Sequence, residues 1–246
     1  MTPDAALVRR RMGAAFASVP PRSDILVRYE PGWWAALSEL AAPDANMVLI
    51  HEDDAEAVGE ALALVNQRGM PALFMFAGAA EPLAAVLPSE WNHVGAMPVM
   101  TKQLGGEQDD ARVRAAGVED VPVCSALMRQ AFGLPPEVCD FFATTLIPSP
   151  GTFWILEDDG EPVSAVFAHQ VDDSVSIWCM STPPSAQRKG YGRALLGAAL
   201  ARAAADGATW GALGATEAGY PLYDATGWTT TDQWQLYVNA TSEQFG

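Results

Sequence analysis

The stretch that decides the fold is Gln187-Arg188-Lys189-Gly190-Tyr191-Gly192-Arg193. An apolar segment, residues 175–180, precedes it, and a segment rich in leucine and alanine, residues 194–205, follows it. This order predicts a strand, a glycine-containing turn and a helix. The first backbone N–H groups of a helix have no partner within the helix, and the helix dipole adds positive charge there. The stretch therefore predicts a binding site for a phosphate or diphosphate group.

The positive charge of this stretch stands out in an acidic chain. The sequence has 14 Lys and Arg residues against 30 Asp and Glu, a formal net charge of −16. No Lys or Arg occurs between Arg129 and Arg188, and only Arg202 follows Arg193. The alternative is that these cations only decorate an exposed helix start. Positive side chains in a first helical turn oppose the helix dipole, however, so their clustering favours a bound anion.

Two other phosphate-binding motifs do not fit the stretch. A P-loop needs Gly-x-x-x-x-Gly-Lys-Ser/Thr, and the chain contains no such string. A dinucleotide-binding fingerprint needs a third glycine at the position of Leu195. Neither motif accounts for the stretch.

The pattern Gln-x-x-Gly-x-Gly between a strand and a helix resembles the acyl-CoA pyrophosphate loop of the GNAT (Gcn5-related N-acetyltransferase) family. A second segment supports the resemblance. Residues 219–228, Gly-Tyr-Pro-Leu-Tyr-Asp-Ala-Thr-Gly-Trp, look like the "LYxxxGF" segment of GNAT proteins, with Trp228 at the aromatic position. The likeness spans roughly residues 111–240.

The order of predicted elements also resembles the GNAT fold, and Asp158-Asp159-Gly160 marks a hairpin turn within it. We expect an α/β (α+β) protein with the GNAT acyl-CoA N-acyltransferase fold, a mixed and largely antiparallel sheet flanked by helices, preceded by a smaller α/β domain. Hydrophobic periodicity predicts strands at residues 112–115, 152–157, 162–170, 175–180, 209–214 and 233–238, and helices at residues 118–132, after Pro135-Pro136, and at 192–205 and 217–226.

The first hundred residues carry a weaker pattern and have no anion-binding stretch. They predict strands at residues 46–51, 71–76 and 94–101 and a helix at 54–68. A polar, glycine-containing linker at 105–110 separates predicted domains 1–104 and 111–246. The N-terminal domain resembles the degenerate copy of tandem GNAT proteins, and an α/β accessory domain of other origin is an equal alternative.

The resemblance implies acetyl-CoA as a cosubstrate and no metal. Backbone N–H groups of residues 188–193 would hold the pyrophosphate, and the end of the preceding strand would pair with the pantetheine amides. The residues implied in cofactor binding are Met180, Ser181, Thr182, Gln187, Arg188, Lys189, Gly190, Tyr191, Gly192 and Arg193.

Tyr223 matches the tyrosine that in the family lies near the CoA sulfur and is assigned as general acid. A phenol stays protonated at neutral pH and can donate to a developing thiolate. The alternative is a tyrosine that only packs in the core. No residue stands out as the base. His169 in a strand is more typical of packing, Glu217 of a helix start, and Cys179 of packing rather than attack.

These residues predict an N-acetyltransferase that moves an acetyl group directly from acetyl-CoA to an amine in a ternary complex. The alternative is a non-catalytic acyl-CoA-binding sensor or assembly module. The acceptor is a small-molecule or protein amine, and the acidic chain favours a cationic one and disfavours nucleic acid and anionic membranes. Three scattered cysteines and no sustained apolar leader favour a reducing, cytoplasmic setting. The oligomeric state stays open, with a homodimer as one option.

Overall fold

The computed structural model describes residues 3–20 and 22–239. These residues form two compact units, which we name the C-terminal unit, Met100–Thr229 with residues 3–4, and the N-terminal unit, Ala5–Val99 with residues 230–239. This division does not follow the predicted limits of 1–104 and 111–246. The chain instead passes between the units inside two strands, β5 (Asn92–Gln103) and β11 (Thr229–Val238). The local pattern of a strand does not reveal its pairing partner, so the sequence carried no signal for this division.

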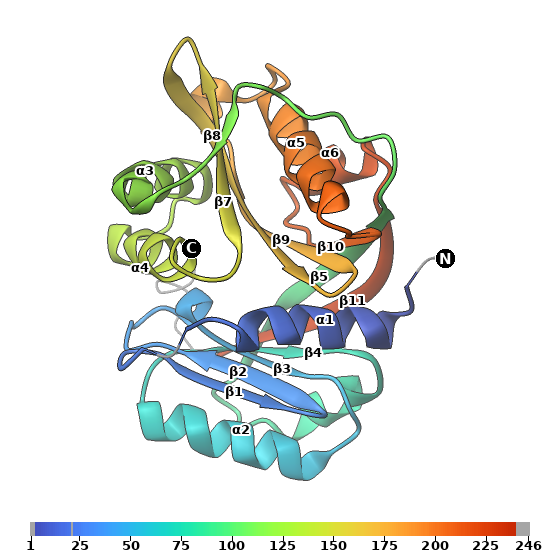
Figure 1. The fold of residues 1–246 in the computed structure, drawn as a ribbon. Coiled ribbons are helices and arrows are strands. Elements are labelled where there is room, and N and C mark those ends of the chain that lie inside the picture. Colours follow the sequence, from blue (N-terminus) through green and yellow to red (C-terminus); the bar gives the residue numbers. More distant parts are fainter. Residues whose placement is uncertain (1–2, 21, 240–246) are drawn as a thin grey trace. The chain divides into compact units, whose positions relative to one another are not determined.

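The C-terminal unit is built on the strand order β10-β9-β8-β7-β6. Strands β6 to β9 pair antiparallel and β9 pairs parallel with β10. Helices α3 and α4 cover one face of these strands and α5 covers the other (Figure 1). The elements are β6 (Val113–Ala115), α3 (Val121–Phe132), α4 (Pro136–Leu146), β7 (Thr152–Asp158), β8 (Glu161–Val171), β9 (Ser174–Ser181), α5 (Tyr191–Ala205), β10 (Trp210–Gly214) and α6 (Tyr220–Asp224).

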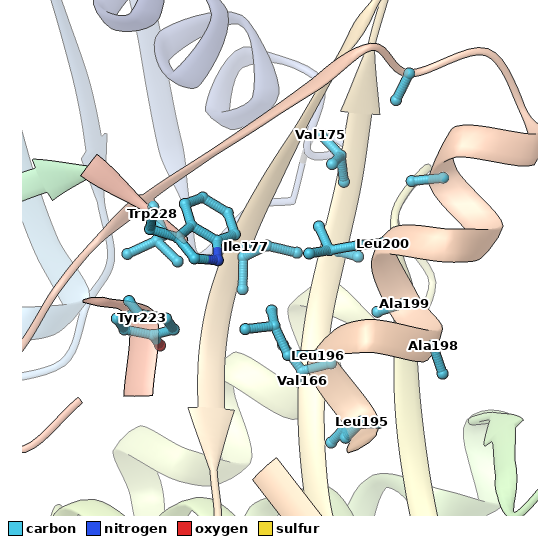
Figure 2. Close-up of a cluster of buried hydrophobic side chains, with 14 of the residues drawn as sticks. Val166, Val175, Ile177, Leu195, Leu196, Ala198, Ala199, Leu200, Tyr223 and Trp228 are labelled. Carbon is cyan, nitrogen blue, oxygen red and sulfur yellow. The ribbon is translucent and has the colours of Figure 1, made fainter. Parts of the chain in front are cut away.

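Alternating side chains of β7 and β8 face the two helical layers. Phe153 and Phe167 belong to the buried cluster that includes α3 and α4. Leu156 and Val166 belong to the cluster that includes Leu195 of α5 (Figure 2). This period of two is what a strand buried on both faces requires.

The predicted hairpin turn at Asp158-Asp159-Gly160 is confirmed. Asp159 and Gly160 have φ of 52° and 80°, and positive φ at both central residues is the requirement of the tight hairpin turn between β7 and β8. Asp172, with φ of 50°, makes the turn between β8 and β9. Helix α6 is shorter than the predicted 217–226, because residues 216–219 form a turn in which the Gly219 N–H donates to the Thr216 carbonyl and hydroxyl oxygens.

The N-terminal unit has the strand order β1-β2-β3-β4-β11-β5. Besides β5 and β11 it contains α1 (Ala5–Ala17), β1 (Leu26–Glu30), β2 (Trp33–Leu37), β3 (Asn46–Ile50), α2 (Ala55–Arg68) and β4 (Leu73–Phe76). The predictions missed α1, β1 and β2. Strands β1 to β3 pair antiparallel, and β3 pairs parallel with β4, with α2 between them in the chain. The C-terminal unit repeats this order: β7 to β9 pair antiparallel, and β9 pairs parallel with β10, with α5 between them in the chain. This repeated order favours a degenerate copy of one fold over an accessory domain of other origin.

A buried amide holds the entry to β3. Asn46 is 1% exposed, and its side-chain oxygen accepts from the Ser38 N–H at 2.7 Å. Its side-chain nitrogen donates to the carbonyl oxygens of Leu40, Ala42 and Pro71 at 2.8–2.9 Å. One side chain therefore satisfies backbone groups from two separate segments, residues 38–42 and Pro71.

Asn46→Ala removes four hydrogen bonds to backbone groups, of which the Ser38 N–H and the Ala42 carbonyl each keep one other partner. We expect it to lower the free energy of unfolding by about 2–4 kcal/mol. Asn66→Ala on the exposed side of α2 is the matched control, expected to change it by less than about 0.5 kcal/mol. Urea unfolding followed by circular dichroism measures both. Equal effects of the two substitutions would contradict this role for Asn46.

Candidate active site

The predicted anion-binding stretch forms the turn between β9 and α5. Arg188 and Gly190 both have left-handed backbone conformations, with φ of 63° and 84°. Such a conformation is strained for a residue other than glycine, and strained residues concentrate at functional sites. Gly190 is the N-cap of α5, and no side chain caps the helix. The N–H groups of residues 191–193 lie before the first intrahelical bond, from Ala194 N to Gly190 O, and so are available to an anion.

The cations of this turn lack counter-charges in the structure. In the C-terminal unit Lys102, Arg112, Arg114 and Arg202 each pair with a carboxylate. Arg188, Lys189 and Arg193 are exposed and have no ion pair among the described residues. The positive charge at the start of α5 is therefore uncompensated.

The side chain of Gln187 shapes the turn. Its Nε2 donates to the carbonyl oxygen of Thr182 at 3.0 Å and so ties the end of the turn to its beginning. Ser164 of β8 holds the same region, because its hydroxyl contacts the Ser181 carbonyl at 2.9 Å and the Thr182 hydroxyl at 2.7 Å. The turn is thus fixed to the sheet from two sides.

Strands β9 and β10 separate just before this turn. Their parallel pairing runs from Ser174 to Ile177 of β9, which then continues to Ser181 past the last pair. A β-bulge falls at the same place, and Cys179 within it has φ of 50°. A bulge takes its extra residue out of the ladder. On the side of β10, the edge of β9 at Met180 and Ser181 therefore has no strand paired with it.

Three elements meet at Gly192. A Cβ added there would lie 3.3–3.4 Å from Met180 Cε, Leu222 Cδ2 and Thr182 Oγ1. The absence of a side chain lets the start of α5 approach the end of β9 and α6. The predicted binding residues Met180, Thr182 and Gly192 are thus neighbours in space.

Tyr223 lies on α6 beside this junction and is 6% exposed (Figure 2). Its ring contacts Trp228 edge to face, with 6.0 Å between ring centroids. Burial raises the pKa of the Tyr223 hydroxyl to about 12. Among the described residues this hydroxyl has no hydrogen-bond partner. It is a protonated donor without an acceptor.

A cavity of about 280 Å³ opens on the α6 side of α5. Arg193 lies at one end, Leu196 and Leu200 continue along the helix, and the ion pair of Lys102 and Glu107, 3.1 Å long, forms another wall. Sequence patterns gave no indication of Lys102 or Glu107, because they come from a strand end and a linker far from the turn in sequence.

The comparison with protein families identifies this arrangement. Residues 123–228 match the model of the acetyltransferase (GNAT) family. The chain carries a GNAT-family domain. The matched residues include both segments that carry the resemblance in the sequence, the turn at 187–193 and all of 219–228.

Solved structures share the fold over nearly the whole chain. A GCN5-related N-acetyltransferase from Kribbella flavida aligns with a TM-score of 0.68 and 17% identity, covering 97% of this chain and 96% of its own. A protein described as a GNAT-family acetyltransferase from Novosphingobium aromaticivorans aligns with a TM-score of 0.64 and 15% identity, covering 97% and 100%. At these identities the likeness establishes the fold, which confirms the predicted fold class. No curated protein matches the sequence.

His169 and Cys179, which were considered as catalytic groups, are poorly suited to that role. His169 pairs with Ser176, four residues along β8 from Ala165, which pairs with Ser181. The bulge lies between the pairs Ala165–Ser181 and Phe167–Trp178, so at about 3.3 Å per residue His169 lies about 7–13 Å from it along β8, and burial lowers its pKa. Burial raises the pKa of the Cys179 thiol to about 12, so a thiolate nucleophile is disfavoured.

The described residues contain no group of three or more His, Cys, Asp or Glu placed to hold a metal ion. Within the same described ranges, no helix has both the length and the apolar character needed to cross a bilayer.

The equivalent helix start in the N-terminal unit is occupied by its own side chains. Asp54 caps α2 by accepting from the N–H groups of Glu56 and Ala57 at 2.9 and 3.3 Å. Glu52 and Asp53 precede it in the chain, and Glu56 lies in the first turn. This start is capped and acidic where α5 is uncapped and basic, so it is unsuited to a diphosphate.

The pKa of Tyr223 makes stability depend on pH. The folded pKa of about 12 exceeds the unfolded value of about 10, so the hydroxyl's contribution is full below about pH 10 and is lost as the pH rises toward 12. The free energy of unfolding of the wild type is expected to fall by about 2 kcal/mol more than that of Tyr223→Phe between about pH 9 and pH 12. Urea titrations at each pH measure this, and parallel curves for the two proteins would contradict it.

Proposed function

We propose that the GNAT domain is an N-acetyltransferase that transfers an acetyl group from acetyl-CoA to an amine acceptor in a ternary complex. The observation that carries the proposal is the uncapped start of α5 with three unpaired cations, next to the free edge of β9. The start of α5 offers N–H groups and positive charge to a diphosphate. The free edge of β9 offers backbone groups to a pantetheine arm.

The donor would lie along the residues that meet in the structure. The diphosphate would accept from the N–H groups at the start of α5, with Arg188 and Lys189 supplying charge. The pantetheine amides would pair with the edge at Met180, Ser181 and Thr182. The Ser181 carbonyl already accepts from Ser164, and that of Thr182 from Gln187. The carbonyl and N–H of Met180 are therefore the most open groups for this pairing.

In the transfer step the amine nitrogen forms a bond to the thioester carbonyl carbon, the C–S bond breaks, and the thiolate takes up a proton. Tyr223 is the proposed donor of that proton. Burial raises the pKa of the Tyr223 hydroxyl to about 12, so at neutral pH it holds a proton that it can donate to the departing thiolate.

The acceptor is proposed as a small-molecule or protein amine that reaches the site as a cation and loses a proton before attack. The net charge of −16 favours the approach of cations. No residue stands out as the base, and His169 lies toward the end of β8 away from the Ala165–Ser181 pair. Water would then carry the amine proton away.

That missing base also favours a second candidate, a non-catalytic acyl-CoA-binding module. The two functions separate by one measurement. Thiol release from acetyl-CoA across a panel of amines, weighted toward polyamines and other cationic amines, requires transfer. Binding of acetyl-CoA without release for any acceptor would favour the binding module.

Arg188→Ala with Lys189→Ala is expected to weaken acetyl-CoA binding about tenfold, because two uncompensated cations near the diphosphate are lost. Adding a bulky residue at Gly190 should abolish binding. Arg129→Ala, which removes another exposed cation of the same unit without a described ion pair, is the matched control and should bind as the wild type does. Isothermal titration calorimetry measures the affinities. Unchanged binding in the double variant would remove the basis of the proposed site.

Tyr223→Phe is expected to lower kcat about 10²-fold while the KM for acetyl-CoA changes little, because it removes a proton donor and keeps the ring. Acceptor-dependent thiol release gives both constants. Full activity in this variant would exclude Tyr223 as the acid. Thermal unfolding near the wild-type temperature shows that the fold is intact.

A further inference from the structure

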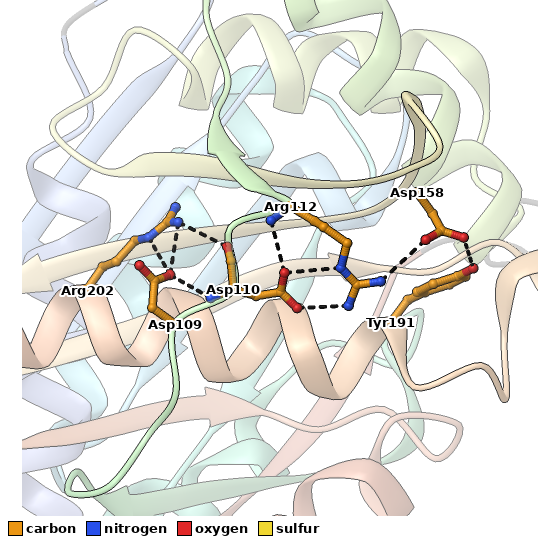
Figure 3. Close-up of polar contacts among 6 residues, drawn as sticks. All are labelled: Asp109, Asp110, Arg112, Asp158, Tyr191 and Arg202. Atoms are coloured by element: carbon orange, nitrogen blue, oxygen red, sulfur yellow. Dashed lines mark hydrogen bonds and ion pairs between the residues drawn. The ribbon is translucent and has the colours of Figure 1, made fainter.

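The first residue of α5 is held by a polar chain that reaches across the sheet (Figure 3). Tyr191 donates its hydroxyl hydrogen to Asp158 Oδ2 at 2.5 Å. Asp158 ends β7 at the hairpin turn, and its Oδ1 accepts from Arg112 at 3.4 Å. Arg112 also binds Asp110 with two nitrogens, at 3.1 and 2.8 Å. The start of α5 is thereby connected to the β7–β8 hairpin and to the segment before β6.

This chain places a carboxylate close to a site that has to receive a diphosphate. Asp158 is separated from the start of α5 by little more than the length of the Tyr191 side chain. Exposed charges within about one Debye length of each other, about 10 Å at about 0.1 M salt, still repel, so the charge of Asp158 opposes a diphosphate at the start of α5. Arg112 lies on the other side of the same carboxylate and supplies the opposite charge.

We propose that Asp158 and Arg112 are positioning residues for the diphosphate site: Asp158 holds Tyr191 and the start of α5 in place, and Arg112, which Asp158 shares with Asp110, offsets part of the charge of Asp158. This inference rests on the proposed function, because it assumes that acetyl-CoA binds at the start of α5. Asp158 and Arg112 lie outside the turn. They affect donor binding through Tyr191 and do not contact the donor.

Arg114 provides the contrast within the same segment. It is as exposed as Arg112, at 41% against 45%, and it also pairs with two carboxylates. Its partners are Asp120 and Glu157, neither of which contacts α5 in a described hydrogen bond. Loss of Arg114 therefore leaves uncompensated charge elsewhere in the unit.

The test is a set of four variants whose affinity for CoA is measured by calorimetry. Arg112→Gln leaves Asp158 uncompensated and is expected to weaken binding about threefold at about 0.01 M salt, with a smaller effect at about 0.15 M. Asp158→Asn keeps an oxygen acceptor for Tyr191 without the charge and should bind at least as tightly as the wild type. The double variant Arg112→Gln, Asp158→Asn should recover wild-type affinity. Arg114→Gln should match the wild type.

A donor without a diphosphate gives the second readout. With S-acetylpantetheine the kcat/KM of Arg112→Gln should equal that of the wild type, since no repulsion is present. Tyr191→Phe removes the bond to Asp158 and should weaken CoA binding about threefold. A merely structural role would move both donors together, and neither salt nor Asp158→Asn would reverse it.

The inference is overturned if Arg112→Gln and Arg114→Gln weaken CoA binding equally. It is also overturned if adding Asp158→Asn to Arg112→Gln does not restore CoA affinity. Its failure is distinct from failure of the proposed function. If the wild type itself binds no CoA, the proposed donor site is wrong. If CoA binds and its affinity does not depend on Arg112 or Asp158, the donor site stands and only the role of these two residues is wrong.

Discussion

The structure of this site depends on one constraint, that the first N–H groups of a helix need partners from outside the helix. Helix α2 meets it with a capping side chain, Asp54, whereas α3, α4 and α5 have no side-chain cap. Helix α5 has glycine at that position and no cap. The neighbouring features are consistent with keeping these groups available. Arg188 and Gly190 adopt left-handed backbone conformations in the turn, and the Gln187 side chain donates to the Thr182 carbonyl. Gly192 has no side chain, so the end of β9 packs closely against the start of α5.

The sequence was most informative where local chemistry decides structure. The hairpin at Asp159-Gly160 and the start of α5 within one residue of its predicted position follow from glycine and turn residues that act within a few positions. The site residues predicted from Gln187 to Arg193 fall in one turn for the same reason.

Other features left no local signal. Strand β2 is a short apolar run whose Trp33 and Trp34 are both buried, and such runs do not distinguish a strand from a core helix. The bulge at Cys179 depends on pairing with β8 rather than on the residue itself. The contact of Tyr191 with Asp158 joins residues 33 positions apart, and only the sheet brings them together.

Charge distribution separates the two units more clearly than topology does. Both contain an antiparallel meander, a helix and a parallel strand, yet one helix starts after Glu52, Asp53 and Asp54 and the other after Arg188 and Lys189. In an acidic protein, general repulsion would oppose an anionic donor. The C-terminal unit counters it locally, since its carboxylates pair with Arg112, Arg114 and Arg202, while the cations at the turn stay unpaired among the described residues. Because screening confines exposed charges to about a Debye length, this local arrangement, and not the net charge, determines whether a diphosphate is attracted.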